Sequence, residues 1–208
     1  MALITPPSWL QSGTYPAESD RLTAQALYAT TGIIGASSLE VIENSPAGMS
    51  VKVNTGWAAI VGTTQPNMGV YTSYNDAVAT LTVTTADPTN PRIDRVVVTI
   101  RDSYYIGVDD DVIFQVIAGT PAGSPSAPAT PANSISLATV LVGAAVTQIN
   151  TADITDTRVV VTSNLTLGDP LPSQAGNNGK YLSTDGSTAS WATITTDPTS
   201  TVFMLMGA

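Results

Sequence analysis

The stretch NPRIDRVVVTIR, residues 90–101, carries the densest strand pattern of the chain. Its apolar side chains alternate between two faces, with Val96, Val98 and Ile100 on one face and Ile93 and Val97 on the other. A strand that is apolar on both faces is typical of the middle of a sheet. The pattern therefore predicts a central β-strand over residues 93–101.

Segments with a period of two flank this strand on both sides of the sequence. In them apolar residues alternate with polar ones, and Gly, Pro and Asn occupy the intervening turns. The expected strands cover residues 49–53, 56–61, 69–74, 79–83, 112–118 and 135–143. Such a series of short strands is typical of an antiparallel β-sandwich or barrel. We also expect Trp57, which follows Gly56 at a strand start, to lie in the core.

One short helix is expected before the strands. Glu18 and Asp20 place negative charge in a first turn, Ser19 is a candidate cap, and residues 21–30 contain good helix formers. Its apolar stripe consists of Leu22, Ala26 and Ala29, with Leu27 beside it. We expect the helix to end at Thr31 and Gly32.

Two segments depart from the β pattern. Residues 119–132 (GTPAGSPSAPATPA) carry four prolines between strand-like flanks, which predicts an extended surface connection. After residue 162 apolar residues become too sparse for a separate core, although aromatic side chains remain. That part is either disordered or wound together from several copies, and its aromatic residues favour assembly. We therefore expect a docking segment at 1–35, a β-domain at 36–162 and a shaft or tether at 163–208.

The composition excludes several classes of protein. Without Cys or His, the chain has no disulfide, no zinc site of the usual kind, no thiol nucleophile and no Ser-His-Asp triad. Seven Lys and Arg against sixteen Asp and Glu give a net charge of −9, which argues against nucleic-acid binding. No apolar run is long enough to cross a membrane, and residues 1–10 do not resemble a signal peptide. Only 11% of residues are charged, which fits either a surface covered by other subunits or a sheet face rich in Thr and Ser.

Carboxylates are the first candidate site residues. The run Asp109-Asp110-Asp111 suggests a calcium loop or a solvated turn, and its spacing favours the turn. A glycosidase would need two facing acids, for which the sequence offers Asp94, Asp102, Asp153 and Asp156. Arginines beside Asp94 and Asp156 favour ion pairs that fix strand ends instead. We therefore expect no catalytic residue, no metal, no cofactor and no enzymatic activity.

Tyrosines are the second group of candidates. They lie near strand ends, where exposed rings can stack on sugars: Tyr71, Tyr74, Tyr104 and Tyr105. Tyrosine is also common in strands and at subunit contacts, so core and interface roles remain alternatives.

Several motifs together resemble the baseplate and tail-fibre proteins of long-tailed bacteriophages. In that family a strand like NPRIDRIV, a loop like GTPAASP.AP and an ending like ANITDTR recur in this order. The present chain has NPRIDRVV at 90–97, GTPAGSP at 119–125 and ITDTR at 154–158. The opening SWLQSGTY at 8–15, with ESDR at 18–21, is similar to the start of minor tail proteins from phages of actinobacteria. Residues 171–186, LPSQAGNNGKYLSTDG, together with Trp191, resemble a module of fibre shafts.

This resemblance implies a structural protein of the virion, made in the host cytoplasm and placed at the tail tip as a homotrimer. It implies an N-terminal part that contacts other tail or baseplate proteins and a β-domain that carries outward modules. The expected tail-docking residues are Trp9, Tyr15, Leu22 and Leu27. The expected residues of the trimer axis are Tyr181, Leu182, Trp191 and Phe203. Because no large receptor-binding head precedes the end at Ala208, we expect an adaptor or short fibre.

A different function stays open at this point. The β-domain itself could recognise host cell-wall glycan through tyrosines and aspartates near 71–76 and 102–111. The structural role in the tail is our leading hypothesis, and glycan binding is the alternative.

Overall fold

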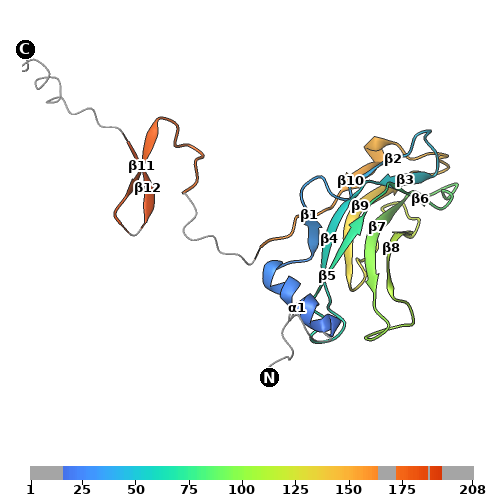
Figure 1. The fold of residues 1–208 in the computed structure, drawn as a ribbon. Helices are drawn as coiled ribbons and strands as arrows, with labels where there is room; N and C mark the ends of the chain where they lie inside the picture. The colour runs from blue at the N-terminus through green and yellow to red at the C-terminus, as the bar shows by residue number, and fades with distance from the viewer. Residues whose placement is uncertain (1–15, 164–171, 187, 194–208) are drawn as a thin grey trace, which may run out of the picture. The chain divides into compact units, whose positions relative to one another are not determined.

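The computed structural model of the chain describes residues 16–163, 172–186 and 188–193. The chain divides into two compact units, Met1–Asn164 and Leu165–Ala208 (Figure 1). Trp9, Tyr15 and Phe203, which we expected at the tail-docking surface and the trimer axis, lie outside the described residues.

In its described residues, 16–163, the first unit is mainly β, as predicted, with one α-helix. Its elements in chain order are α1 (Ala17–Leu27), β1 (Gly32–Ile34), β2 (Val41–Glu43), β3 (Ser50–Val53), β4 (Gly56–Val61), β5 (Val70–Asn75), β6 (Ala79–Thr82), β7 (Arg92–Arg101), β8 (Asp111–Ile117), β9 (Ser134–Val142), the 3-10 turn η1 (Thr151–Asp153) and β10 (Ile154–Asp156). Three antiparallel sheets form, in the strand orders β1-β4-β5, β2-β3-β6 and β10-β9-β7-β8. None of them closes on itself, so the barrel alternative is wrong for the described part of the chain.

One hydrophobic core joins the three sheets. Its members are buried side chains of alternate strand positions, among them Ile33, Ala58, Ile60, Val41, Val51, Val53, Val96, Val98, Ile100, Leu137 and Val140. Figure 1 shows the strands of the β1-β4-β5 sheet running alongside those of the β10-β9-β7-β8 sheet. The alternation read from the sequence therefore decides which side chains fill this core.

Strand β7 is the central strand that the sequence predicted. It pairs with β8 on one side and β9 on the other, and Val97 is buried on the face opposite Val96 and Val98. The proline-rich segment 119–132 connects β8 to β9, as expected, and returns to β7. There the Arg95 Nε donates to the Pro128 carbonyl at 2.6 Å.

A buried ion pair fixes the start of β7. Arg92 Nε donates to Asp94 Oδ1 at 2.8 Å, and the two side chains are 5% and 0% exposed. Asp94 Oδ1 also accepts the Gly119 N–H at 2.9 Å, while Arg92 Nη1 donates to the Thr85 carbonyl at 2.8 Å. The expectation that Asp94 serves an ion pair is confirmed. A charge pair without access to water needs such extra hydrogen bonds to be stable.

The end of the first unit is attached to its beginning. Val161 N donates to the Ile33 carbonyl at 3.0 Å, so residues 159–161 run parallel to β1, and Ala29 N donates to the Thr162 carbonyl at 2.8 Å. This pairing gives Tyr28 an extended backbone, and α1 ends at Leu27, earlier than the sequence suggested.

Helix α1 packs against β5. Gly69, with φ +70°, permits this contact, because a Cβ at that position would lie 2.8 Å from the Arg21 backbone carbon. The expectation that Ser19 caps the helix is wrong: Pro16 is the N-cap and Ser19 is buried within the first turn. The Ser19 hydroxyl has no hydrogen-bond partner among the described residues.

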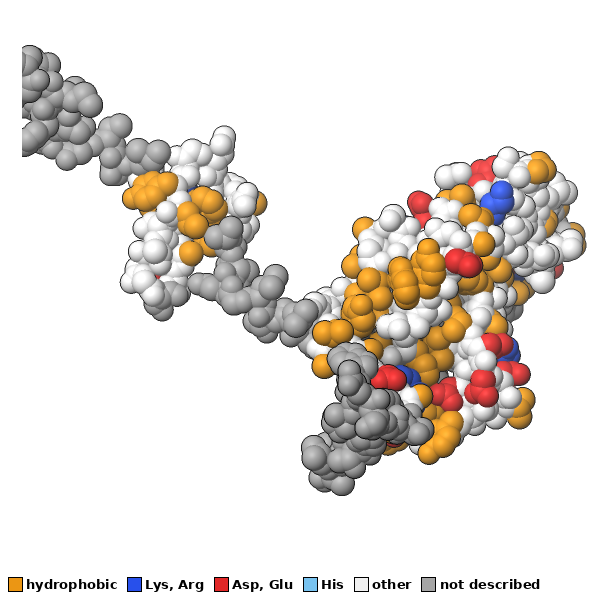
Figure 2. Space-filling view, viewed as in Figure 1, with side chains coloured by type: hydrophobic (Ala, Val, Ile, Leu, Met, Phe, Trp, Pro, Cys, Tyr) orange, Lys and Arg blue, Asp and Glu red, His pale blue; other side chains and the backbone are white. Residues whose placement is uncertain are grey.

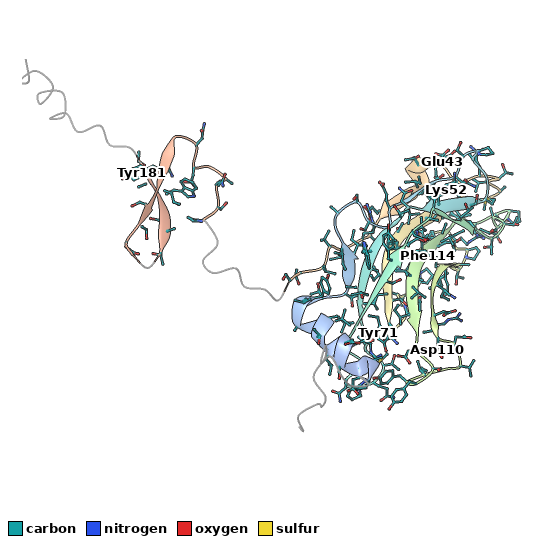
Figure 3. The ribbon with its side chains drawn as sticks, in the orientation of Figure 1. Glu43, Lys52, Tyr71, Asp110, Phe114 and Tyr181 are labelled. Carbon is teal, nitrogen blue, oxygen red and sulfur yellow. The ribbon has the colours of Figure 1, made fainter. Side chains whose placement is uncertain are left out.

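The second unit contains a β-hairpin of β11 (Lys180–Thr184) and β12 (Ala189–Thr193). Leu182 faces Trp191 across the hairpin, and the Trp191 indole N–H donates to the Pro172 carbonyl at 3.0 Å. Tyr181 is paired with Ala192 and therefore points to the opposite face. Tyr181, labelled in Figure 3, is 51% exposed and Leu182 is 43% exposed. The described hairpin therefore leaves apolar side chains partly uncovered on both faces.

Candidate functional site

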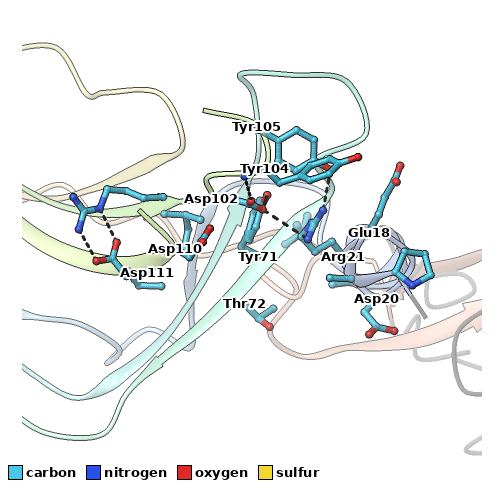
Figure 4. Close-up of a pocket in the computed structure, with 17 residues that line it drawn as sticks. Glu18, Asp20, Arg21, Tyr71, Thr72, Asp102, Tyr104, Tyr105, Asp110 and Asp111 are labelled. Atoms are coloured by element: carbon cyan, nitrogen blue, oxygen red, sulfur yellow. Dashed lines mark hydrogen bonds and ion pairs between the residues drawn. The ribbon is translucent and has the colours of Figure 1, made fainter. Parts of the chain in front are cut away.

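One pocket of about 720 Å³ opens between α1, β5 and the end of the β7–β8 hairpin. We call it the tyrosine pocket. Its lining includes Glu18, Asp20 and Arg21 from α1, Tyr71 and Thr72 from β5, and Arg101, Asp102, Tyr104, Tyr105, Asp110 and Asp111 from the β7–β8 end (Figure 4). Its size falls in the usual range for sites that bind small molecules.

Arg21 connects the three walls of the tyrosine pocket. Its Nε donates to the Met68 carbonyl at 2.6 Å. Its Nη2 donates to the Tyr105 hydroxyl at 2.9 Å (Figure 4). The guanidinium carbon lies 4.9 Å from the centre of the Tyr71 ring, within cation–π range, and Nη1 is 3.8 Å from Asp102 Oδ2. The Arg21 guanidinium is thus paired with groups of the protein itself, and these contacts hold α1 in place.

Tyr71 is fixed from the β5 side. Its hydroxyl donates to Asp102 Oδ2 at 2.7 Å. Burial of the ring, followed by this hydrogen bond to the carboxylate, raises the pKa of Tyr71 above its usual value. The phenol therefore remains a neutral donor.

The β7–β8 connection presents a second aromatic group. Asp102 Oδ1 accepts the Tyr104 N–H at 3.0 Å, and Asp110 accepts from both the backbone N–H and the hydroxyl of Ser103 at 2.8 Å. Tyr104 and Tyr105 meet edge to face, with ring centroids 5.0 Å apart. Tyr104 is 85% exposed, so its ring is available to a ligand although the loop beneath it is tied down.

Asp109 and Asp110 lie in this connection, as the predicted solvated turn required, and Asp111 is the first residue of β8. Asp109 Oδ2 accepts from Arg101 Nη1 at 2.7 Å, and Asp111 forms a two-point contact with the same guanidinium. The hydrogen bond from Arg101 lowers the pKa of Asp111 below its usual value. Among the described residues, no three acidic side chains are arranged to hold a metal ion.

Five carboxylates and two guanidinium groups line the tyrosine pocket. Both guanidinium groups already contact aspartates, Arg21 at Asp102 and Arg101 at Asp111. The pocket therefore offers acceptors and aromatic faces, but its two cations are engaged.

The structure brings together three of the four tyrosines that the sequence singled out. Tyr71, Tyr104 and Tyr105 line the tyrosine pocket, whereas Tyr74 does not. Tyr74 stacks on Trp57 instead, with ring centroids 4.5 Å apart and an angle of 30° between the rings. The prediction that Trp57 lies in the core is wrong, because Ala58 and Ile60 face the core and the strand period turns Trp57 outward.

Trp57 and Tyr74 belong to an uncharged surface on the outer side of the β1-β4-β5 sheet. Ile34, Trp57 and Tyr74 are successive register partners across the sheet, and Tyr28 and Thr72 lie beside them. We call these five residues the outer-face patch. Trp57 and Tyr74 are 46% and 52% exposed, and Figure 2 shows hydrophobic side chains gathered over β1, β4 and β5.

The remaining candidates lie on two other surfaces. On α1, Leu22 is half-buried and Leu27 is exposed. On the hairpin, Leu182 and Trp191 share one face and Tyr181 lies on the other. The expected ion pair of Asp156 is confirmed, since Arg158 Nη2 lies 2.7 Å from Asp156 Oδ2.

Sequence reasoning missed the part that Arg21 plays in the pocket. Its partners Met68 and Tyr105 are 47 and 84 residues away in the chain, so no local spacing pointed to them. The cation within the helix was the only available signal.

No helix in the described ranges is long and apolar enough to cross a membrane. Comparison with protein-family models, curated proteins and solved structures gives no match for this chain.

Proposed function

We propose that this protein is a non-enzymatic structural component of a phage tail tip, baseplate or short tail fibre. The proposal begins from the motifs at 90–97, 119–125 and 154–158, which resemble those of phage baseplate and tail-fibre proteins. It adds the finer architecture that this resemblance implies: a β-sandwich docked on the tail through its N-terminal part, and a trimeric shaft formed by residues 163–208.

The contacts of these motifs support a structural role. The Gly119 N–H of the second motif donates to Asp94 of the first at 2.9 Å. Arg95 of the first motif donates from Nη1 to the Ser136 hydroxyl at 2.6 Å, and Ser136 is hydrogen-bonded to Thr157 of the third motif at 2.7 Å. The second and third motifs are thus each hydrogen-bonded to the first, the second directly at Asp94 and the third through Ser136 at Arg95. This gives a physical reason for their occurrence together that needs no catalysis.

The observation that carries the proposal is the uncovered apolar surface of the hairpin. A two-stranded hairpin alone is at best marginally stable in water. Here Tyr181 and Leu182 are about half exposed on opposite faces. Contact with other copies would bury both side chains, as expected for a trimeric shaft. The exposed Leu27 on α1 and the outer-face patch offer further surface to neighbouring tail proteins.

Sedimentation of the full chain at micromolar concentration tests the assembly. We expect a trimer, which Leu182→Asp dissociates because it places a charge inside the shaft. Val78→Asp is the matched control, since Val78 is an exposed apolar residue of the first unit, 52% against 43% for Leu182, and we expect this variant to stay trimeric. A monomeric wild-type chain would contradict the trimer. Dissociation by both variants alike, or by neither, would contradict the claim that the hairpin forms the contact between copies.

A density map of the intact virus particle tests the location. We expect the β-domain of this chain at the tail tip. Particles that contain the chain elsewhere would rule out the tail-tip location, and particles that lack it altogether would rule out the structural role.

A second candidate function is binding of host-surface saccharide by the first unit. It is favoured by the convergence of Tyr71, Tyr104 and Tyr105 on one pocket with aspartates beside them. Binding of the purified full chain to host cell envelopes, weakened by Tyr104→Ala, is the result this function requires.

A further inference from the structure

We propose that the tyrosine pocket binds a saccharide that carries no negative charge. The inference rests on the second candidate function and names the class of ligand that this pocket would select. Its starting point is a cavity of about 720 Å³ whose walls combine aromatic rings with carboxylate and hydroxyl groups.

The aromatic part of the pocket is prepared to contact the apolar face of a sugar ring. Tyr105 accepts a hydrogen bond from Arg21 and meets Tyr104 edge to face, so its ring is fixed by two neighbours. Tyr104 is highly exposed, yet its backbone N–H is bound to Asp102. Little conformational entropy would be lost when a ligand covers these rings, because they are already positioned.

The polar part of the pocket is suited to hydroxyl donors. Glu18 and Asp20 line the helix wall, and Asp110 lines the opposite wall, where one hydrogen-bonding partner is Ser103. A carboxylate has about four acceptor sites on its two oxygens, so Asp110 keeps acceptor capacity for a ligand. Sugar hydroxyls supply the matching donors.

The charge of the pocket discriminates among saccharides. Five carboxylates line it, and its two guanidinium groups already contact Asp102 and Asp111. A uronate or phosphate group would enter next to like charges without a cation to pair with. Such like-charge contacts are unfavourable, and the repulsion is weakened by salt. A neutral sugar meets no such opposition.

The test measures binding of matched pairs of sugars to the full chain by ligand-observed NMR. The probes are the methyl glycosides of glucose, galactose and mannose, each beside its methyl uronide. We expect at least one neutral glycoside to bind, and its uronide to bind about tenfold more weakly or worse in dilute buffer. Raising the salt concentration should narrow this difference, since it screens the carboxylates.

Variants locate the binding. Tyr104→Ala should lower the affinity for the neutral glycoside by about tenfold. Folding is preserved, because the Tyr104 side chain is largely exposed. Tyr74→Ala, an exposed tyrosine outside the pocket, is the control and should leave the affinity unchanged. Glu18→Gln combined with Asp20→Asn should raise the affinity for the uronide relative to that for the glycoside. The double variant removes two negative charges and keeps an acceptor oxygen on each side chain.

Each negative result has a distinct meaning. If no sugar binds, both the saccharide function and this inference are wrong, whereas the structural role in the tail is unaffected. If a uronide binds as well as its glycoside, saccharide binding stands but the charge selection is overturned. Equal weakening by Tyr104→Ala and Tyr74→Ala would show that the tyrosine pocket is not the site.

Discussion

Removal of the Asp94 carboxylate should be one of the most damaging single changes in the β-domain. Asp94 is fully buried and accepts two hydrogen bonds from Arg92, at 2.8 and 3.2 Å, and one from the Gly119 N–H at 2.9 Å. Asp94→Ala would leave the Arg92 guanidinium buried without a counter-charge. Breaking a buried ion pair in this way costs about 3–5 kcal/mol. The freed Gly119 N–H adds to the loss, because it belongs to the same network.

Urea unfolding followed by circular dichroism measures this effect. With a slope of about 2 kcal/mol per molar urea, the loss lowers the midpoint by about 1.5–2.5 M. The urea midpoint of Asp94→Asn should lie between those of the wild type and Asp94→Ala, since the amide keeps an acceptor oxygen for Arg92 but not the negative charge. It also provides a measurable variant if Asp94→Ala does not fold.

Two further variants make the reasoning refutable. Asp109→Ala removes an exposed partner of Arg101 and should leave the midpoint unchanged, as expected of surface ion pairs. Arg92→Met combined with Asp94→Leu should be more stable than Asp94→Ala, because no charge is left buried. If Asp94→Ala shifts the midpoint no further than Asp109→Ala, the claim that this pair fixes β7 is wrong.

Three other predictions address the helix, the tyrosine pocket and the outer-face patch. Gly107→Ala should lower the free energy of unfolding, measured in urea, by about 1–2 kcal/mol, because of its positive φ alone. Gly69→Ala should lower it further, because a Cβ at Gly69 also meets the Arg21 backbone. Equal losses would argue against this close approach of α1 and β5. Because the pKa of Tyr71 is raised, the folded protein keeps a proton that the unfolded chain releases at about pH 10. The free energy of unfolding therefore falls as the pH rises above that value. Tyr71→Phe should remove the part of this loss that comes from Tyr71, as measured by urea midpoints from pH 9 to 11. The same pH dependence in the variant and the wild type would refute this role of Tyr71. Trp57→Ser should lower the free energy of unfolding by about 1 kcal/mol or less, because only the stacking on Tyr74 is lost. Loss of a core tryptophan would lower it by about 3–5 kcal/mol. Urea unfolding therefore distinguishes an exposed from a core Trp57.

The apolar periodicity of the chain was sufficient to predict most of the long strands. The expected strand at 56–61 coincides with β4, and those at 93–101, 112–118 and 135–143 differ from β7, β8 and β9 by one residue at one or both ends. Strands β1, β2 and β10 were missed, because three residues are too few to show a period. They exist because β4, β3 and β9 offer them backbone partners.

Local chemistry also indicated the ion pairs, but not the exposure of Trp57 or the end of α1. Asp94 and Asp156 each have an arginine two residues away, a distance within reach along a strand. Trp57 was assigned to the core from its size and position, whereas the phase of β4 places it outside. Helix propensity continued beyond Leu27, and the chain left the helix because Tyr28 pairs with Ser163, a residue 135 positions later.

By itself the sequence determined the β class of this protein, its low charge and the chemistries that it lacks, because these follow from composition and from the two-residue period. Only the tertiary structure decided that Tyr71, Tyr104 and Tyr105 share a pocket while Tyr74 lies elsewhere. The pocket depends on Arg21, which contacts residues 47 and 84 positions away. Contacts of that range are set by how the sheets and α1 pack, and no local pattern in the chain encodes them.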